Sequence, residues 1–277
     1  MPAPVPARLP DLLPRYDGVL LDAYGVLVDA AGALPGAAAL LATLEARAVP
    51  FLVVTNDASR SPATCAARFA SLGLAIGAER ILTSGELLAD HPGLRSARTV
   101  VLGTDDSRAY VRAAGATLVE LSPGVALDAL AVCDDAGFPF LEGCELALSA
   151  VVRAVDAGRP PRLLLPNPDL VYPKGGGELG LTAGAIAHLI EAVLVRRFGA
   201  AAPRFEHLGK PTRHLFDRAC ARLGTRALLM VGDQLETDVA GARAAGLDAA
   251  LVDGVSRWSP THAADAGAPT YLLAGLD

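Results

Sequence analysis

One apolar run near the start of the chain constrains the fold most strongly. Residues 18–21 read Gly-Val-Leu-Leu, without polar residues at alternate positions, and the run ends at Asp22. Such a run is typical of a strand covered on both faces, as in a parallel sheet. The carboxylate of Asp22 would then lie at the carboxyl end of the strand, where open α/β sheets bind their ligands. Gly25 would let the chain turn sharply just afterwards, so the segment predicts a nucleophile or a metal ligand at this edge.

Apolar runs alternate with amphipathic helical stretches over most of the chain, which is the pattern of α/β layers. One series consists of strands over 19–22, 51–55, 227–231 and 249–252, with helices over 36–48, 62–72, 212–223 and 235–245. Ser61 suits the N-cap of the helix over 62–72, with Pro62 at its first position. We therefore predict an α/β fold with a parallel sheet.

A second α/β series interrupts the first. It consists of strands over 99–102, 129–133 and 163–165, helices over 107–114, 142–157 and 183–198, and a Pro/Gly-rich loop over 166–180. Both crossings between the series fall in Gly/Ala/Pro-rich segments, which are typical of domain boundaries. We therefore expect a discontinuous core domain over 1–84 and 203–277, with a smaller α/β domain inserted over 85–202.

Composition narrows the classes of function. The chain of 277 residues has a net charge of −6 and no basic run, which argues against nucleic acid as a partner. No uninterrupted apolar stretch reaches membrane length, and the proline-rich opening lacks the apolar centre of a signal peptide. We therefore expect a cytoplasmic protein with no membrane partner. The four cysteines form no CxxC or zinc-like spacing, so we expect reduced, buried thiols.

Four segments far apart in sequence carry a polar residue where a predicted strand ends or a helix begins. They contain Asp22, Thr55, Lys210, and the pair Asp233 and Asp238. If the strands are parallel neighbours, all four segments meet at one edge of the sheet. Each has a structural interpretation by itself, as a strand end, a helix cap or a solvated turn. Their joint occurrence in this order favours a site.

These residue types suit phosphoryl transfer. A carboxylate attacks a phosphate ester well only where a cation neutralises the site, and Asp22, Asp233 and Asp238 would form an all-oxygen cluster of the kind that Mg²⁺ takes. Lys210 is one of only two lysines among 24 basic residues, and its ammonium would offset charge between nucleophile and phosphoryl group. The Thr55 hydroxyl and backbone N–H groups near Asn56 would donate hydrogen bonds to phosphoryl oxygens.

The set of motifs resembles that of the haloacid dehalogenase-like (HAD) superfamily. The matching segments are Asp22-Ala-Tyr-Gly-Val, Val54-Thr55-Asn56, Leu208-Gly209-Lys210-Pro211, and Gly232-Asp233 with Thr237-Asp238. Residues 55–60, 165–169 and 209–211 further resemble the class IIA branch of sugar and nucleotide phosphatases, which carries its cap insert between the second and third motifs. The resemblance spans about residues 16–255 and is closer in the core than in the cap.

The resemblance implies a Rossmann-like core, an α/β cap over the site, and catalysis through an aspartyl-phosphate on Asp22. Mg²⁺ would bind Asp22, the backbone carbonyl of Tyr24 and Asp233, with Asp238 nearby or bound through water. Thr55 and Lys210 would hold the phosphoryl group of a small phosphorylated metabolite. Cap contacts would choose the substrate, and a homodimer would be unsurprising.

Tyr24 departs from the pattern, because phosphatases of this superfamily usually carry a second Asp there as general acid and base. A phenol with a pKa near 10 can donate a proton but is almost never a base at neutral pH. Because general acid–base help contributes roughly 10²–10⁴-fold, we expect a slow phosphatase. Asp57 is a candidate substitute, and the ring of Tyr24 could also pack against the cap.

Two other functions stay open at this point. The Asp-Ala-Tyr-Gly segment also resembles metal-independent haloacid dehalogenases, although Asp233 and Asp238 would repel Asp22 without a cation. A metabolite-binding protein that has lost turnover is the third alternative, supported by Tyr24.

In the cap, the loop over 133–138 would face the substrate or form a solvated turn. Asn167 is a candidate substrate contact near the domain junction, or a member of an Asx-turn.

Overall fold

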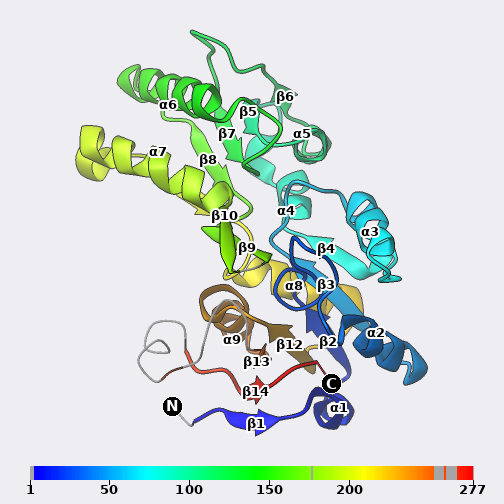
Figure 1. Ribbon diagram of the computed structural model, residues 1–277. Coiled ribbons are helices and arrows are strands. Elements are labelled where there is room, and N and C mark those ends of the chain that lie inside the picture. Colours follow the sequence, from blue (N-terminus) through cyan, green and yellow to red (C-terminus); the bar gives the residue numbers. More distant parts are fainter. Residues whose placement is uncertain (1–2, 176, 253–258, 260–266, 277) are drawn as a thin grey trace.

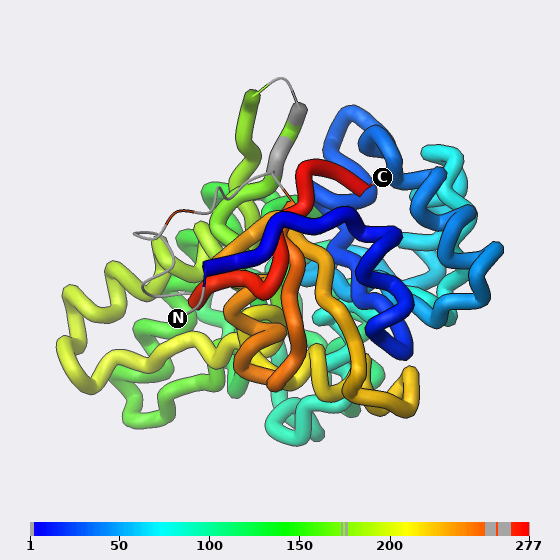
Figure 2. Tube along the Cα trace, turned by 90° about the horizontal axis from the view of Figure 1, so that it is seen from below, coloured from blue at the N-terminus to red at the C-terminus, as the bar shows by residue number. Residues whose placement is uncertain are grey.

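The computed structural model describes residues 3–175, 177–252, 259 and 267–276. Its larger sheet has seven strands in the order β1-β14-β13-β12-β2-β3-β4, and all its pairings are parallel. The strands are β1 (Val5–Ala7), β2 (Gly18–Leu21), β3 (Phe51–Thr55), β4 (Ile81–Thr83), β12 (Leu228–Gly232), β13 (Asp248–Val252) and β14 (Tyr271–Leu273). The first and last of these run side by side near the two chain ends (Figure 2).

Helices cover both faces of this sheet, as the unbroken apolar run of β2 predicted. They are α1 (Leu9–Leu12), α2 (Ala37–Ala46), α3 (Pro62–Ser71), α8 (Arg213–Leu223) and α9 (Ala240–Ala244). Side chains of β2 point alternately to the two faces: Val19 and Leu21 pack with the first three helices, whereas Leu20 packs with α8 and α9. The central strand is therefore fully buried, and its carboxyl end is the place where the chain can present polar groups.

The inserted segment forms a second parallel sheet in the order β11-β8-β7-β5-β6 (Figure 1). Its strands are β5 (Arg98–Leu102), β6 (Thr117–Leu118), β7 (Ala129–Val132), β8 (Arg162–Leu165) and β11 (Phe205–His207). One face packs on α6 (Phe140–Asp156) and α7 (Ala183–Phe198), and the other on α4 (Gly85–Ala89) and α5 (Asp105–Ala113). The fold is thus α/β, with a parallel-sheet core and a cap, as predicted.

The structure corrects the sequence prediction in one functionally important segment. Residues 166–180 do not form a continuous loop, because β9 (Val171–Gly175) and β10 (Glu178–Leu181) pair as an antiparallel hairpin. The Pro and Gly residues of this segment indicated a loop, whereas cross-strand pairing overrides that preference. The hairpin extends from the cap toward the core (Figure 1).

Smaller differences concern the element ends. The predicted strand over 227–231 begins and ends one residue later as β12, and the helix over 235–245 consists of a π-helical turn, Leu235–Val239, followed by α9. Ser61 caps α3 as predicted, since its side chain accepts a hydrogen bond from the Thr64 N–H. The strand β11 lies beyond residue 202, where we placed the second crossing, yet it pairs with β8 of the cap sheet.

The start of α5 in the cap is hydrogen-bonded to the core loop after β3. The Thr104 hydroxyl donates to the Ser59 carbonyl at 2.5 Å, and the Ser107 hydroxyl donates to the Ala58 carbonyl at 2.8 Å. The carboxylate of Asp106 accepts from the Ser61 N–H at 2.8 Å. These bonds hold one side of the cap against the core segment that follows Thr55.

Candidate active site

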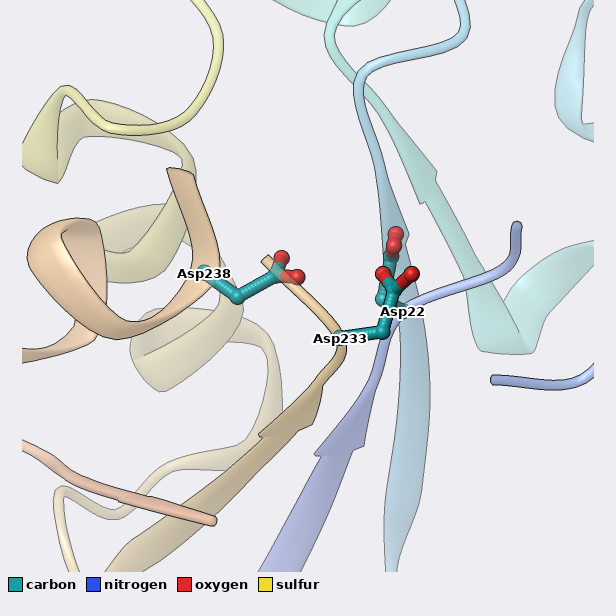
Figure 3. A group of neighbouring side chains, drawn as sticks. All are labelled: Asp22, Asp233 and Asp238. Carbon is teal, nitrogen blue, oxygen red and sulfur yellow. The ribbon is translucent and has the colours of Figure 1, made fainter. Parts of the chain in front are cut away.

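Three carboxylates converge at the carboxyl ends of two neighbouring strands. Asp22 directly follows β2 and Asp233 directly follows β12, and these strands pair in register with Leu21 opposite Val231. Asp238 comes from the π-helical turn after β12. Each of the three offers one carboxylate oxygen, and these oxygens lie within 4.8 Å of one another (Figure 3). The parallel register thus produces the convergence that the sequence predicted.

Lys210 places its ammonium group between two of these carboxylates. Its Nζ donates to Asp22 Oδ1 at 2.7 Å and to Asp238 Oδ1 at 2.6 Å, and only 2% of its side chain is exposed. Burial by itself would lower the pKa of Lys210, but the negative charges of Asp22 and Asp238 raise it above its usual range. The ammonium therefore stays charged at neutral pH.

The pKa of Asp22 is raised by burial, in spite of the neighbouring lysine. Burial and the neighbouring charge of Asp238 raise its pKa well above the usual range of a carboxyl, while Lys210 acts to lower it. One buried ammonium does not neutralise three buried carboxylates. Additional positive charge would stabilise the ionised cluster.

Two glycines make room for the carboxylates. Gly25 has a φ of +85°, and a Cβ there would lie 2.0 Å from Asp233 Oδ2. At Gly232, a Cβ would lie 2.3 Å from the Cβ of Asp238. A side chain at either position would displace a carboxylate from the cluster, so both glycines are required by close approach as well as, at Gly25, by backbone conformation.

Asn56 holds the lysine segment in place. Its Oδ1 accepts from the Lys210 N–H at 2.7 Å, while its Nδ2 donates to the Lys210 carbonyl and to Asp169 Oδ1, both at 3.0 Å. These bonds join the end of β3, the lysine segment and the cap segment between β8 and β9. The side-chain amide therefore has its donors and acceptor engaged with protein, which leaves backbone N–H groups as the means by which this segment could bind a ligand.

The other predicted residues of this segment differ in their environment. Thr55 ends β3 beside β2, and its hydroxyl oxygen accepts from the Asp57 N–H at 3.2 Å. The Asp57 carboxylate accepts from Ser59 N–H and hydroxyl, and from the backbone N–H and guanidinium of Arg60, at 2.7–3.1 Å. This full set of bonds favours a structural role for Asp57 over that of a catalytic base.

Tyr24 connects the nucleophile loop with the cap. Its ring makes an edge-to-face contact with Tyr172 of the hairpin, with centroids 6.0 Å apart and an interplanar angle of 77°. The guanidinium of Arg68 lies 5.0 Å from its ring centroid. The interpretation that this ring packs against the cap is confirmed. Burial raises the pKa of the Tyr24 phenol further.

A cavity of about 230 Å³ adjoins the carboxylates and lies between core and cap. Its lining includes Asp22, Tyr24, Thr55, Asn56, Asp57, Ser59, Arg60, Asp134, Asp135, Ala136, Asn167, Asp169, Val171, Tyr172, Thr182 and Gln234. The cap loop over 133–138 therefore faces the cavity through Asp134, Asp135 and Ala136. Asn167 lies at the cavity and also accepts from the Asp169 N–H at 3.1 Å, as an Asx-turn does.

Sequence reasoning missed several lining residues. Val171, Tyr172 and Thr182 belong to or follow the hairpin that was predicted as a loop, so no pattern indicated that they would face the core. Gln234 lies between Asp233 and Asp238, and its position next to the fourth motif was the signal available. None of the helices in the described ranges is both long and apolar enough to cross a membrane.

A parallel-sheet core with an inserted α/β cap, and a lysine among three aspartates at the interface, define a class of capped α/β hydrolases. A model of haloacid dehalogenase-like hydrolases matches residues 19–117, and a HAD-hydrolase-like model matches residues 207–277. Human chronophin is 31% identical, over 97% of this chain and 90% of its own length. The chain belongs to the haloacid dehalogenase-like hydrolases, in their class IIA phosphatase branch.

Other relatives agree with this assignment. A D-glycerol 3-phosphate phosphatase of Mycobacterium tuberculosis is 34% identical over 80% of this chain, and the match spans 60% of that relative's length. A possible sugar phosphatase from Cytophaga hutchinsonii has a structure with a TM-score of 0.87 and 29% identity, with 99% of each chain covered. A glycerol phosphate phosphatase from Mycobacterium tuberculosis, solved in complex with magnesium, has a TM-score of 0.76 and 28% identity, over 96% of this chain and 77% of that one. The predicted enzyme class, a HAD-like phosphatase, is confirmed.

Proposed function

We propose that this chain is a Mg²⁺-dependent phosphatase that hydrolyses a small phosphorylated metabolite through an aspartyl-phosphate on Asp22. The observation that carries the proposal is the cluster of Asp22, Asp233 and Asp238 around one buried lysine, directly beside a cavity. Three of the relatives named above are phosphatases of glycerol phosphate or sugar phosphates by name, and one of these was solved with magnesium.

The donor set fits Mg²⁺. All three side chains offer carboxylate oxygens, which hard divalent cations prefer, and the oxygens are close enough to share one ion. Asp22 and Asp233 would hold the ion together with the backbone carbonyl of Tyr24, and Asp238 directly or through water. A bound Mg²⁺ would neutralise the carboxylates and the phosphoryl oxygens.

Residues of this chain can serve as nucleophile and as hydrogen-bond donors in a reaction of two steps. A carboxylate oxygen of Asp22 attacks phosphorus, and the bond from phosphorus to the ester oxygen breaks. The Thr55 hydroxyl, neighbouring backbone N–H groups and the charged Lys210 stabilise the phosphoryl oxygens. Water then attacks the phosphorus of the aspartyl-phosphate, which releases inorganic phosphate and restores the Asp22 carboxylate.

Tyr24 limits the proton transfers. Its phenol can donate a proton to the departing ester oxygen, and the phenolate then recovers a proton from solvent, because burial raises the pKa of Tyr24. The phenol is thus un-ionised again at neutral pH and does not act as base for the attacking water, whose proton leaves with the released phosphate or passes to solvent. Asp57 has its carboxylate engaged by Ser59 and Arg60. We therefore propose that turnover is slow compared with relatives that carry an aspartate at this position.

The direct test is phosphate release from p-nitrophenyl phosphate by the purified protein, with Mg²⁺ and with EDTA. We expect slow release that EDTA abolishes and that Asp22→Asn reduces to background. Asp105→Asn, which removes the fully exposed carboxylate of a cap residue, serves as the control and should retain the rate.

The same preparation distinguishes the alternatives. Metal-independent release of halide from 2-chloropropionate, without phosphate release, would indicate a dehalogenase. Mg²⁺ binding without turnover of any phosphate ester would indicate a binding protein. The cluster of three carboxylates opposes the first alternative, because ionised carboxylates this close repel one another unless a cation joins them.

A further inference from the structure

The cavity has a core end and a cap end of different chemistry. Asp22, Thr55 and Gln234 line it from the core, where the phosphoryl group would bind. Asp134 and Asp135 line it from the loop after β7 of the cap, and both are partly exposed. The part of a phosphate ester that leaves as an alcohol would therefore extend toward this pair of carboxyl groups.

The cationic groups near the cavity are already engaged. Arg60 is the one cation among the described residues that line it, and its Nη1 donates to Asp57 Oδ2 at 2.8 Å and to Ser59 Oγ at 3.3 Å. No ion pair found within the described ranges includes Asp134 or Asp135. The part of the cavity lining formed by Asp134 and Asp135, here called the cap wall, thus carries negative charge without a compensating cation.

We propose that Asp134 and Asp135 select a small, hydroxylated leaving group without an anionic substituent, so that the substrate is the phosphate ester of a short polyol. The inference rests on the proposed phosphatase function. Hydroxyl groups donate hydrogen bonds to carboxyl oxygens, whereas a carboxylate or a second phosphate would meet like charge in a half-enclosed space, which weakens its binding. The cavity of about 230 Å³ is also smaller than the roughly 300–1,000 Å³ typical of drug-sized ligands, which favours a leaving group of few carbons.

The protonation of the pair supports this assignment. Burial and the adjacent Asp135 raise the pKa of Asp134 to about 7. The Asp134 carboxyl therefore keeps its proton over part of the neutral range, so that it can donate to a hydroxyl group as well as accept from one. A residual negative charge remains, which is what excludes an anion.

The test compares two phosphate esters with the same three-carbon skeleton. Glycerol 3-phosphate ends in a hydroxymethyl group where 3-phosphoglycerate ends in a carboxylate. With Mg²⁺, we expect the wild type to prefer glycerol 3-phosphate in kcat/KM by about tenfold or more, and the Asp134→Asn/Asp135→Asn double variant to reduce that ratio by about tenfold. The exposed cap variant Asp105→Asn should leave the ratio unchanged.

Calorimetry supplies a readout that does not depend on turnover. In Asp22→Asn, which lacks the attacking carboxylate, both esters stay intact. We expect this variant to bind glycerol 3-phosphate more tightly than 3-phosphoglycerate. The difference in affinity should become smaller when Asp134 and Asp135 are also replaced by Asn. Equal kcat/KM and equal affinity for the two esters in the wild-type cap, or an unchanged ratio in the double variant, would overturn the inference. If p-nitrophenyl phosphate is not hydrolysed, the proposed function fails, and the binding ratio still decides whether the cap wall rejects the anion.

Discussion

Replacement of Lys210 by methionine tests the electrostatic centre of the site. Methionine has a similar length but no charge, so it removes the two bonds from Nζ to Asp22 and Asp238, at 2.7 and 2.6 Å. At an effective dielectric constant of about 20, each contact has a gross attraction of about 6 kcal/mol, which desolvation of the charges largely offsets. Loss of one partner from a buried ionic group typically costs about 3–5 kcal/mol, because the remaining charges stay buried without compensation.

The assay is urea unfolding of wild type, Lys210→Met and Lys174→Met in EDTA and in Mg²⁺. Lys174 is the other lysine of the chain and is exposed on β9, so it is the matched control. We expect Lys210→Met to lower the free energy of unfolding by about 3–5 kcal/mol in EDTA, and Mg²⁺ to restore part of the loss. We expect phosphatase activity to fall by about 10²–10³-fold.

A loss below about 1 kcal/mol in EDTA, equal to that of Lys174→Met, would refute the reasoning, because it would mean that the carboxylates do not depend on the ammonium. A large loss of stability with full activity would separate the two roles and remove Lys210 from the proposed chemistry. The position of the urea midpoint and the slope should be compared together, so that a change in the unfolded state is recognised.

Further predictions concern the metal, the phenol and the cap. Gly25→Ala should abolish the stabilisation of the protein by Mg²⁺ in thermal unfolding, since a Cβ would lie 2.0 Å from Asp233 Oδ2; an unchanged Mg²⁺-dependent shift would contradict this. Tyr24→Asp should raise kcat for p-nitrophenyl phosphate by about tenfold or more, and an unchanged or lower kcat would reject our account of residue 24. Tyr172→Ala should lower stability by about 0.5–1.5 kcal/mol through loss of the ring pair, measured by urea unfolding with Tyr24→Ala as the second arm of a double-mutant cycle; zero coupling would count against it.

The pH dependence of stability is a prediction for Asp134, whose pKa in the folded protein is raised to about 7. A raised pKa means that the folded state keeps a proton that the unfolded state has lost between about pH 4 and 7. The free energy of unfolding should therefore fall as pH rises through this window, by about 1–2 kcal/mol after allowance for solvent screening. Asp134→Asn should flatten that slope in urea unfolding from pH 4 to 8, and an identical slope would show that Asp134 does not keep its proton in the folded protein.

Local sequence patterns were sufficient for the elements whose burial is continuous. The uninterrupted run of β2, the helical periodicity of α8 and the Ser61 cap each have a physical cause within a few neighbouring residues. The hairpin β9–β10 has no such local cause, since Pro173 and the glycines around it weaken strand preference and its pairing is set by cross-strand contacts. This is also why the edge strand β1 and its neighbour β14, which are short and held by pairing, were not predicted.

The chain order by itself determined which residue types would stand at the ends of the central strands, because buried parallel strands leave only their carboxyl ends for polar groups. Only the tertiary structure decided which groups those residues contact. It placed the Lys210 ammonium between two carboxylates, engaged the Asn56 amide with the protein itself, and brought Tyr24 against the cap. Such choices depend on distances of a few ångströms between segments that lie from 28 to 188 residues apart, and the order of residues along a chain does not contain those distances.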